Sequence, residues 1–252
     1  MKNPIWEPGD MLWDTDINPE GAALRLNYKP SSQTEAFLTT AAFALEETTG
    51  FKKADPWMLA VQPGIRQNLS EKWGLQLAGT YYSTPKVNQS NFVPDYGLNG
   101  GNTLDPKTKL RMYNYDSFNM SGELAYRNPT STKLPFFALF AEYHQAFKPS
   151  QSNHGEVAGA RIGYERAQEQ GQWNFRYMYV FSGDDAWLDF LPDSDRYAGR
   201  TGIRGHELQL QYALSRNFRL DIDYYRSYTG RQPNNQDGNP ENLLQVDMNF
   251  IF

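Results

Sequence analysis

Hydrophobic and polar residues alternate along most of the chain with a period of two. In the clearest stretch, residues 172–181, one face carries Trp173, Phe175, Tyr177, Tyr179 and Phe181. The opposite face carries mostly polar residues, among them Asn174 and Arg176. Because successive side chains of a strand point to opposite sides, this period predicts β-strands with one apolar face.

The same alternation recurs throughout the chain. Further stretches begin near residues 24, 37, 57, 73, 118, 134, 158, 208, 218 and 244. In the second of them the row is Phe37, Thr39, Ala41, Phe43 and Leu45. Residues 134–143 are apolar on both faces, which leaves their register open. The pattern predicts about eleven strands, each close to the ~9–11 residues of a tilted membrane strand.

The connections between these strands alternate in length. Short ones lie near residues 30–32, 68–70, 128–130, 168–171 and 215–217, and longer ones at 46–56, 83–115, 148–155, 182–205 and 228–240. Bacterial outer-membrane barrels combine short periplasmic turns with longer extracellular loops. We therefore expect an all-β, antiparallel up-and-down transmembrane barrel of about 11–12 visible strands.

Composition supports a barrel over membrane helices. Mean hydropathy is −0.71 and aromatics make up 15% of the chain, while the longest apolar run, residues 134–141, is too short for a spanning helix. Aromatic residues gather near strand ends, as in the girdles of membrane barrels: Tyr28, Trp57, Trp73, Tyr81, Tyr126, Tyr164, Trp173, Phe218 and Tyr224. A soluble β-sandwich or barrel that binds a ligand remains an alternative, because periodicity alone does not say which face meets solvent.

The chain is expected to form a single domain, residues 1–252, with an irregular segment at 1–20 and strands and loops over 21–252. Residues 1–8 contain no apolar export signal. An odd number of strands is unusual for bacterial barrels, so we expect truncation at the N-terminus. The net charge of −5 argues against a general nucleic-acid binder. The absence of cysteine excludes disulfides and thiolate metal sites.

Two regions and the terminus carry a resemblance. Residues 14–24 (DTDINPEGAAL), and residues 190–195 (FLPDSD) with 205–210 (GHELQL), resemble segments of the bacterial putative porin family. Phe252 ends an alternating strand and resembles the signal that the outer-membrane assembly machinery reads. The resemblance implies passive diffusion of small hydrophilic solutes through a water-filled lumen.

Charged residues on the polar faces are the candidates for a pore lining: Arg25, Arg66, Glu123, Arg161, Glu165, Arg176, Arg219, Asp221, Asp223 and Asp247. Rings of charged side chains set ion preference in channels. The alternative is that they pair with one another and brace the wall, and both can hold together. Residues 83–115 could constrict the lumen, although we favour an external loop.

Other chemistry is less supported by the pattern. Asp184, Asp185, Asp189, Asp193 and Asp195 could offer oxygen ligands to calcium, but their spacing does not match an EF-hand, so a solvated acidic loop is favoured. His144, His154 and His206 show no converging pattern, and nothing marks Ser152 and His154 as a catalytic pair.

We therefore expect an outer-membrane porin, neither an enzyme nor dependent on a cofactor or metal. A substrate-specific channel or a scaffold barrel is the alternative, and a barrel enzyme a weaker one. The expected partners are outer-membrane lipid, small polar solutes or ions and the barrel assembly machinery, with a possible homo-oligomer and no nucleic acid.

Overall fold

The structure is a computed structural model that describes residues 2–45, 55–89, 100–131, 134–229 and 240–250. These residues form one antiparallel sheet in which each strand pairs with its neighbours in sequence. Its eleven strands are β1 (Glu20–Tyr28), β2 (Thr34–Ala44), β3 (Trp57–Asn68), β4 (Trp73–Ser83), β5 (Ser117–Arg127), β6 (Phe136–Ala146), β7 (His154–Gly163), β8 (Trp173–Ser182), β9 (Ile203–Ser215), β10 (Phe218–Thr229) and β11 (Glu241–Phe250). The all-β, up-and-down fold that the periodicity predicts is confirmed.

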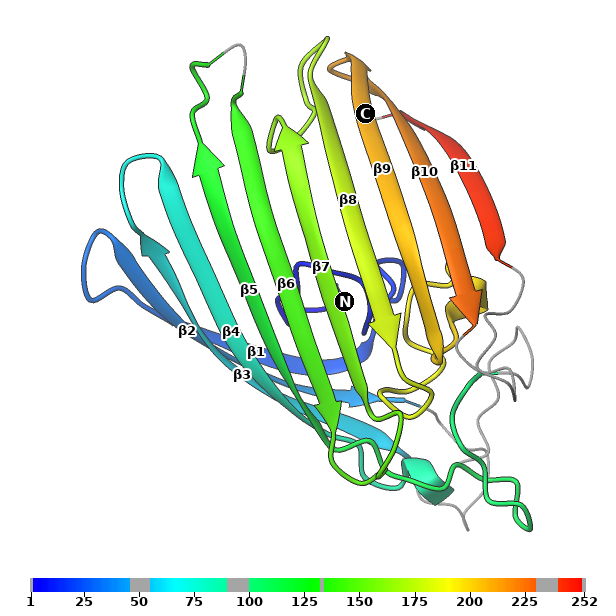
Figure 1. Cartoon of the computed structure of the whole chain (residues 1–252). Coiled ribbons are helices and arrows are strands. Elements are labelled where there is room, and N and C mark those ends of the chain that lie inside the picture. Colours follow the sequence, from blue (N-terminus) through cyan, green and yellow to red (C-terminus); the bar gives the residue numbers. More distant parts are fainter. Residues whose placement is uncertain (1, 46–54, 90–99, 132–133, 230–239, 251–252) are drawn as a thin grey trace.

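The sheet is strongly curved and encloses the N-terminal part of the chain (Figure 1). Short turns join the strands at one end of the sheet and long connections at the other, so we call these the short-turn end and the long-loop end. Among the described residues β1 and β11 each have one paired neighbour. The sheet is the wall of an up-and-down barrel, with β1 and β11 at its two edges.

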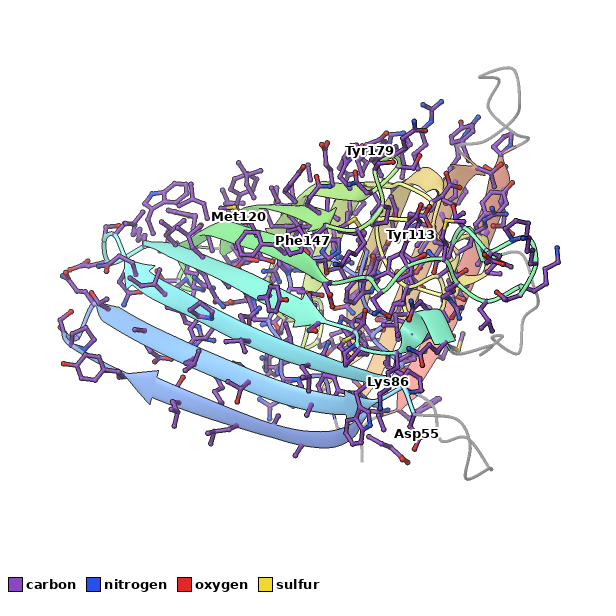
Figure 2. The ribbon with its side chains drawn as sticks, turned by 90° about the horizontal axis from the view of Figure 1, so that it is seen from below. Asp55, Lys86, Tyr113, Met120, Phe147 and Tyr179 are labelled. Atoms are coloured by element: carbon purple, nitrogen blue, oxygen red, sulfur yellow. The ribbon has the colours of Figure 1, made fainter. Side chains whose placement is uncertain are left out.

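The outer face of the sheet exposes large apolar side chains. Leu24, Met120 and Val246 are each more than half exposed, and Met120, Phe147 and Tyr179 lie outside the curved wall in Figure 2. Aromatic residues pair across strands near the short-turn end, where the rings of Trp73 and Tyr126 are 5.3 Å apart. An apolar outer face is the reverse of a soluble barrel, which fills its interior with apolar side chains.

The largely apolar row of β2 lies on the concave face, unlike the apolar rows described above. In β2, Phe37, Thr39, Ala41 and Phe43 are buried on the concave face, whereas Leu38 and its alternate neighbours lie outside. An apolar row on this strand does not mark the outer face, because Phe43 packs edge-on against Trp13 inside the wall, with ring centroids 5.7 Å apart.

The interior is filled near the long-loop end. Residues 2–19, the inner segment, form no strand or helix and lie against the concave face (Figure 1). Met11, Leu12 and Trp13 join one hydrophobic core with Trp187 and Leu188 of the β8–β9 loop (residues 183–202). The first residues are irregular, as the sequence predicts, and several of their side chains are also buried in the core.

The helices of the described part are two short 3₁₀ turns, Val87–Gln89 and Tyr197–Gly199. Neither has the length or the apolar character to cross a membrane.

Candidate functional site

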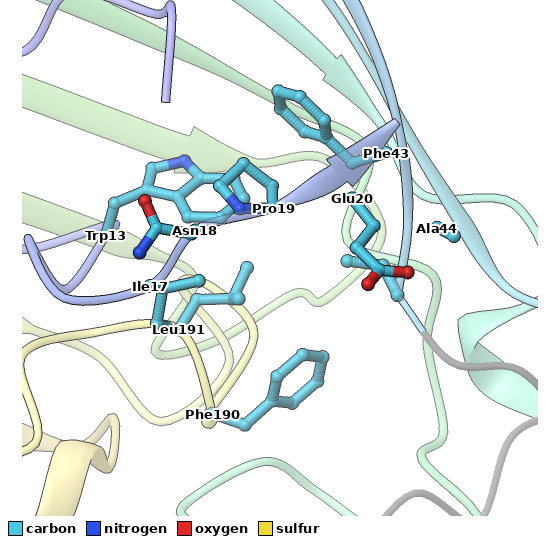
Figure 3. Close-up of a pocket in the computed structure, with 10 residues that line it drawn as sticks. Trp13, Ile17, Asn18, Pro19, Glu20, Phe43, Ala44, Phe190 and Leu191 are labelled. Atoms are coloured by element: carbon cyan, nitrogen blue, oxygen red, sulfur yellow. The ribbon is translucent and has the colours of Figure 1, made fainter. Parts of the chain in front are cut away.

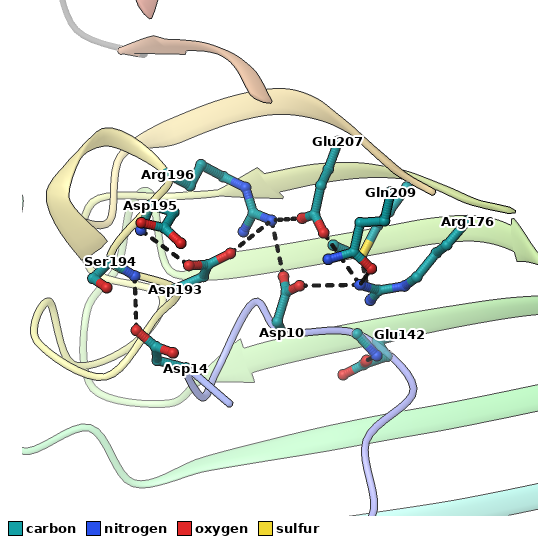
Figure 4. Close-up of polar contacts among 12 residues, drawn as sticks. Asp10, Asp14, Glu142, Arg176, Asp193, Ser194, Asp195, Arg196, Glu207 and Gln209 are labelled. Carbon is teal, nitrogen blue, oxygen red and sulfur yellow. Dashed lines mark hydrogen bonds and ion pairs between the residues drawn. The ribbon is translucent and has the colours of Figure 1, made fainter. Parts of the chain in front are cut away.

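A buried ion cluster joins the inner segment, the β8–β9 loop and two strands. It contains Asp10, Arg176, Asp193, Arg196 and Glu207 (Figure 4). The Arg196 Nη2 atom lies 2.9 Å from Asp10 Oδ1 and 3.8 Å from Asp193 Oδ2, and it also contacts Glu207. The Arg176 Nη1 atom lies 3.3 Å from Asp10 Oδ2 and 3.2 Å from Glu207 Oε1. Asp10 therefore links two arginines that come from separate elements.

Burial makes this cluster structurally important. The side chains of Arg196 and Glu207 are 2% and 1% exposed. A buried charge is tolerated only when it is paired and hydrogen-bonded. Removal of one partner would leave the charges of the others without compensation. The cluster therefore holds the inner segment and the β8–β9 loop together, and we call this set of ion pairs the latch.

The same carboxylates have the spacing of a cation site. Ligand oxygens of Asp10, Asp193 and Glu207 lie within 4.8 Å of one another. The guanidinium of Arg196 contacts all three residues and takes the position that a metal ion would need. The donor set fits an internal ion cluster and does not fit a divalent cation.

The acids of the cluster that lie outside the strands respond differently to this environment. Burial alone would raise the pKa of Asp10, but Arg196 and Arg176 outweigh it and the pKa is lowered. Burial and the charge of Asp10 raise the pKa of Asp193 to about 7, although Arg196 opposes the shift. The negative charge of the cluster is therefore held mainly on Asp10 and less firmly on Asp193.

Further contacts attach the inner segment to the wall. The Gln62 side chain accepts a hydrogen bond from the Trp6 backbone N–H at 2.8 Å and donates one to the Trp6 carbonyl at 2.9 Å. The Tyr82 hydroxyl lies 2.5 Å from a Glu7 carboxylate oxygen, and burial with the nearby charge of Glu142 raises the pKa of Glu7. Glu142 also accepts a hydrogen bond from the Gly9 backbone N–H. The segment is thus fixed to β3, β4 and β6.

The β8–β9 loop is attached just as closely. Trp187, which is fully buried, donates from Nε1 to the Leu12 carbonyl at 2.8 Å. The Asp14 backbone N–H donates to the Leu191 carbonyl at 2.7 Å. These bonds make the inner segment and the loop one packed layer on the concave face.

The prediction of a solvated acidic loop is wrong. Four of its acids, Asp184, Asp185, Asp189 and Asp193, are buried. Asp189 pairs with Arg111 at 2.7 Å, and Asp185 accepts a hydrogen bond from the Tyr115 hydroxyl at 2.9 Å. Internal partners at distant positions in the sequence satisfy these carboxylates, so local composition alone was a misleading guide.

The segment 83–115, for which an external loop was favoured, contains buried residues where it is described. Thr84, Asn102, Arg111 and Tyr115 are buried. The Asn102 side chain donates hydrogen bonds to the carbonyls of Asp184 and Trp187 at 2.8 and 2.7 Å. This part of the segment packs on the β8–β9 loop and so supports the layer that the loop forms with the inner segment.

Toward the short-turn end the concave face carries ion pairs that are more exposed. Arg66 lies 2.5 Å from Glu35, Arg127 lies 2.8 Å from Glu165, and Arg161 pairs with Glu123. Arg25 and Arg66 each place a guanidinium about 5 Å from the ring of Phe37. The side chains of Arg127 and Glu165 are 43% and 47% exposed, so this half presents charge to solvent.

The structure places nine of the ten predicted lining residues on the concave face, and the strand register carries that face across paired positions such as Arg161 and Arg176. The tenth, Glu165, lies two residues beyond the end of β7, where it pairs with Arg127. The concave-face set is Arg25, Arg66, Glu123, Arg161, Arg176, Arg219, Asp221, Asp223 and Asp247. Arg176 is covered by the inner segment, whereas the others lie outside the buried cluster. Phe252 lies outside the described residues.

The histidines do not converge. His144 lies on the concave face between Tyr82 and Trp187, and the rings of His154 and His206 lie among outer-face aromatics. Their separation onto two faces gives no support to a catalytic pair.

Several buried residues that bind the inner segment were missed from sequence. Glu207 stands at a concave-face position of β9, and strict use of the period would have found it. Glu142 lies in the stretch whose register the period left open. Asp10 and Arg196 lie in segments without periodicity, so no sequence signal marked them.

Comparison with known proteins agrees with the architecture. No curated protein matches the chain. A family model described as "Putative porin" matches residues 1–115 and 138–250. That match covers nearly the whole chain, including the inner segment and all strands apart from β5 and the first two residues of β6, so the chain belongs to the putative porin family.

Proposed function

We propose that the protein is an outer-membrane channel for small hydrophilic solutes, narrowed from within by the inner segment and the β8–β9 loop. The observation that carries the proposal is the inverted sheet, apolar outside and charged inside. In water the outer face would leave many large apolar side chains exposed, whereas lipid would cover them. The family membership supports the same conclusion in general terms.

The aromatic belt supports a membrane position for the wall. Near the short-turn end the outer face carries Trp73, Tyr126, Trp173 and Phe218, and Phe218 stacks on Phe250 with ring centroids 4.7 Å apart. Tyrosine and tryptophan favour the boundary between lipid and water, because they combine an apolar body with a polar tip. The outer membrane is the location that this arrangement favours.

A substrate-specific channel is the second candidate, and the packed layer favours it over a wide, unspecific pore. The buried cluster and the core around Trp187 occupy the concave face near the long-loop end. A solute that enters from that end meets this layer before it reaches the charged half. Passage would then depend on the fit of the solute or on movement of the layer.

In this proposal the protein transports solutes and does not catalyse a reaction. Lipid and the barrel assembly machinery are the expected partners, and small polar solutes or ions the expected cargo. The ion pairs of the short-turn half are suited to water-filled surroundings, since they are partly exposed.

The test is single-channel conductance of the folded chain in planar bilayers. Stable steps proportional to salt concentration would support passive diffusion, and saturation with one solute would support the substrate-specific channel. Absence of steps from inserted, folded protein contradicts both.

A pair of variants tests the narrowing. Arg196→Gln weakens the latch between the inner segment and the loop, so we expect larger or longer openings. Arg216→Gln removes an exposed ion pair with Glu169 at the short-turn end and should leave the steps unchanged. Identical steps in wild type and Arg196→Gln would contradict the role of the packed layer.

A further inference from the structure

A pocket of about 480 Å³ opens at the long-loop end, between the inner segment, the end of β2 and the β8–β9 loop (Figure 3). Its size falls within the ~300–1,000 Å³ of small-molecule sites. Three aromatic residues from three segments line it, Trp13, Phe43 and Phe190. Ile17, Leu45 and Leu191 supply further apolar surface.

The polar groups of this pocket are few and one carries charge. Asn18 and Glu20 are its polar side chains, and no lysine or arginine is among the lining residues. In Figure 3 the Glu20 carboxylate points into the space between Leu191 and Ala44. A ligand in the pocket would thus meet a single carboxylate at the edge of an aromatic surface.

The surrounding charge has the same sign. Residues 3–24 contain Glu7, Asp10, Asp14, Asp16 and Glu20 but no lysine or arginine. Asp10 is paired with Arg176 and Arg196, whereas Asp14 accepts a hydrogen bond from the Ser194 backbone N–H at 3.0 Å. Arg111 places its guanidinium 5.0 Å from the centroid of the Phe190 ring, and it pairs with Asp189. Asp16 and Glu20 are exposed, and their field attracts a positive ligand.

We propose that this pocket binds small organic cations in which an ammonium group is attached to an aromatic or compact apolar body. The ammonium would pair with Glu20, and the body would pack among Trp13, Phe43 and Phe190. Cations are attracted to the faces of aromatic rings, most strongly to tryptophan. An anion of the same shape would be repelled by the carboxylate.

This site is independent of the conductance proposed above. It lies at the rim of the wall, so binding does not require solute to cross the wall. Binding can therefore be measured whether or not the protein conducts.

The experiment is a fluorescence titration of the folded full-length chain, with Trp13 as one of its reporters. Three probes of similar shape are compared: benzyltrimethylammonium, the uncharged neopentylbenzene and the anion phenylacetate. We expect saturable binding of the cation, at least tenfold weaker binding of the uncharged probe, and no binding of the anion. Equal affinity for all three would overturn the proposal.

Two variants locate the site. Glu20→Gln keeps the shape of the side chain and should weaken cation binding about tenfold, with little change for the uncharged probe. Ile17→Trp should fill the pocket and weaken both. Glu71→Gln, at an exposed turn residue of the opposite end, should change neither. Cation binding that survives both pocket variants, in protein that circular dichroism shows to be folded, would contradict the site.

Discussion

The two halves of the concave face use the same residue types for different purposes. At the long-loop half, Arg196 and Glu207 are 2% and 1% exposed and fix a packed layer. At the short-turn half, Arg127 and Glu165 are 43% and 47% exposed and face open space. Burial decides the difference, because a buried pair that loses one partner keeps an uncompensated charge, whereas an exposed one is re-solvated.

The largest expected effect comes from breaking the buried half. Arg196→Ala leaves Asp10 and Glu207 without their shared guanidinium, and we expect a loss of about 3–5 kcal/mol in the free energy of unfolding. Denaturant unfolding of the detergent-folded protein measures it.

The matched variant in the exposed half is Arg127→Ala, which removes the partner of Glu165 on the same face. Its expected loss from the ion pair is at most about 1 kcal/mol. Similar losses in the two variants would show that burial does not distinguish the halves.

The second prediction concerns the outer face of the sheet. If the concave face lines a channel, the outer face lies in lipid. Leu210→Arg or Ile222→Arg near the middle of the wall should destabilise the protein by about 2–4 kcal/mol in a bilayer. Folding equilibria in lipid vesicles provide the measurement.

The control lies one residue away on the concave face. Gln211→Arg places its charge beside Asp221, its neighbour across the strands, and should cost little. Gln209 is a poorer control, because its side chain accepts a hydrogen bond from Arg176 at 3.0 Å. Equal costs for Leu210→Arg and Gln211→Arg would reverse the face assignment.

Periodicity predicted the strands and their approximate number, because a strand exposes alternate side chains to alternate surroundings. The interior position of the charged residues required a second signal, the aromatic residues near the strand ends, because the period alone does not distinguish the two faces. It also left the register of residues 134–143 open, and the structure places Phe136, Phe140 and Glu142 of that stretch inside. The period also did not reveal that the row Phe37 to Phe43 of β2 lies inside, where Arg66 and Trp13 contact its rings.

The packed layer could not be predicted in the same way. Its residues lie in segments without a repeating pattern, and their partners are far away in sequence, as with Asp10 and Arg196 or Leu12 and Trp187. Acidic composition suggested solvent exposure for the β8–β9 loop, since sequence does not reveal which arginine or backbone amide will meet each carboxylate.

The third prediction tests how pH acts on the buried half. The pKa of Asp193 is raised to about 7 by burial and by Asp10, while its value in the unfolded chain is about 3.9. Between these values the unfolded chain releases a proton that the folded chain keeps, so this group's contribution to stability falls as pH rises and stays low above about pH 7.

Asp10 acts in the opposite sense, because its pKa is lowered by Arg196 and Arg176 in spite of burial. Its contribution is present above about pH 4 and is lost in acid. We expect Asp193→Asn to flatten the decline in thermal midpoint between pH 5 and pH 8, whereas Asp195→Asn, at the half-buried neighbour, should keep it. An unchanged slope in Asp193→Asn would exclude Asp193 as its source.

The smallest effect on stability, and the most informative for transport, belongs to the exposed half. Arg66→Gln removes a cation that lies 2.5 Å from Glu35 and over the ring of Phe37, at a cost of about 1 kcal/mol or less. Because the pair faces open space, its charge acts on passing ions, so the reversal potential in a salt gradient should shift toward cation preference. Glu35→Gln should shift it toward anions. An unchanged reversal potential in both variants would show that ions do not pass close to Arg66 and Glu35. If Arg196→Gln alters the conductance in the same experiments, the packed layer and not this ion pair controls the passage of ions.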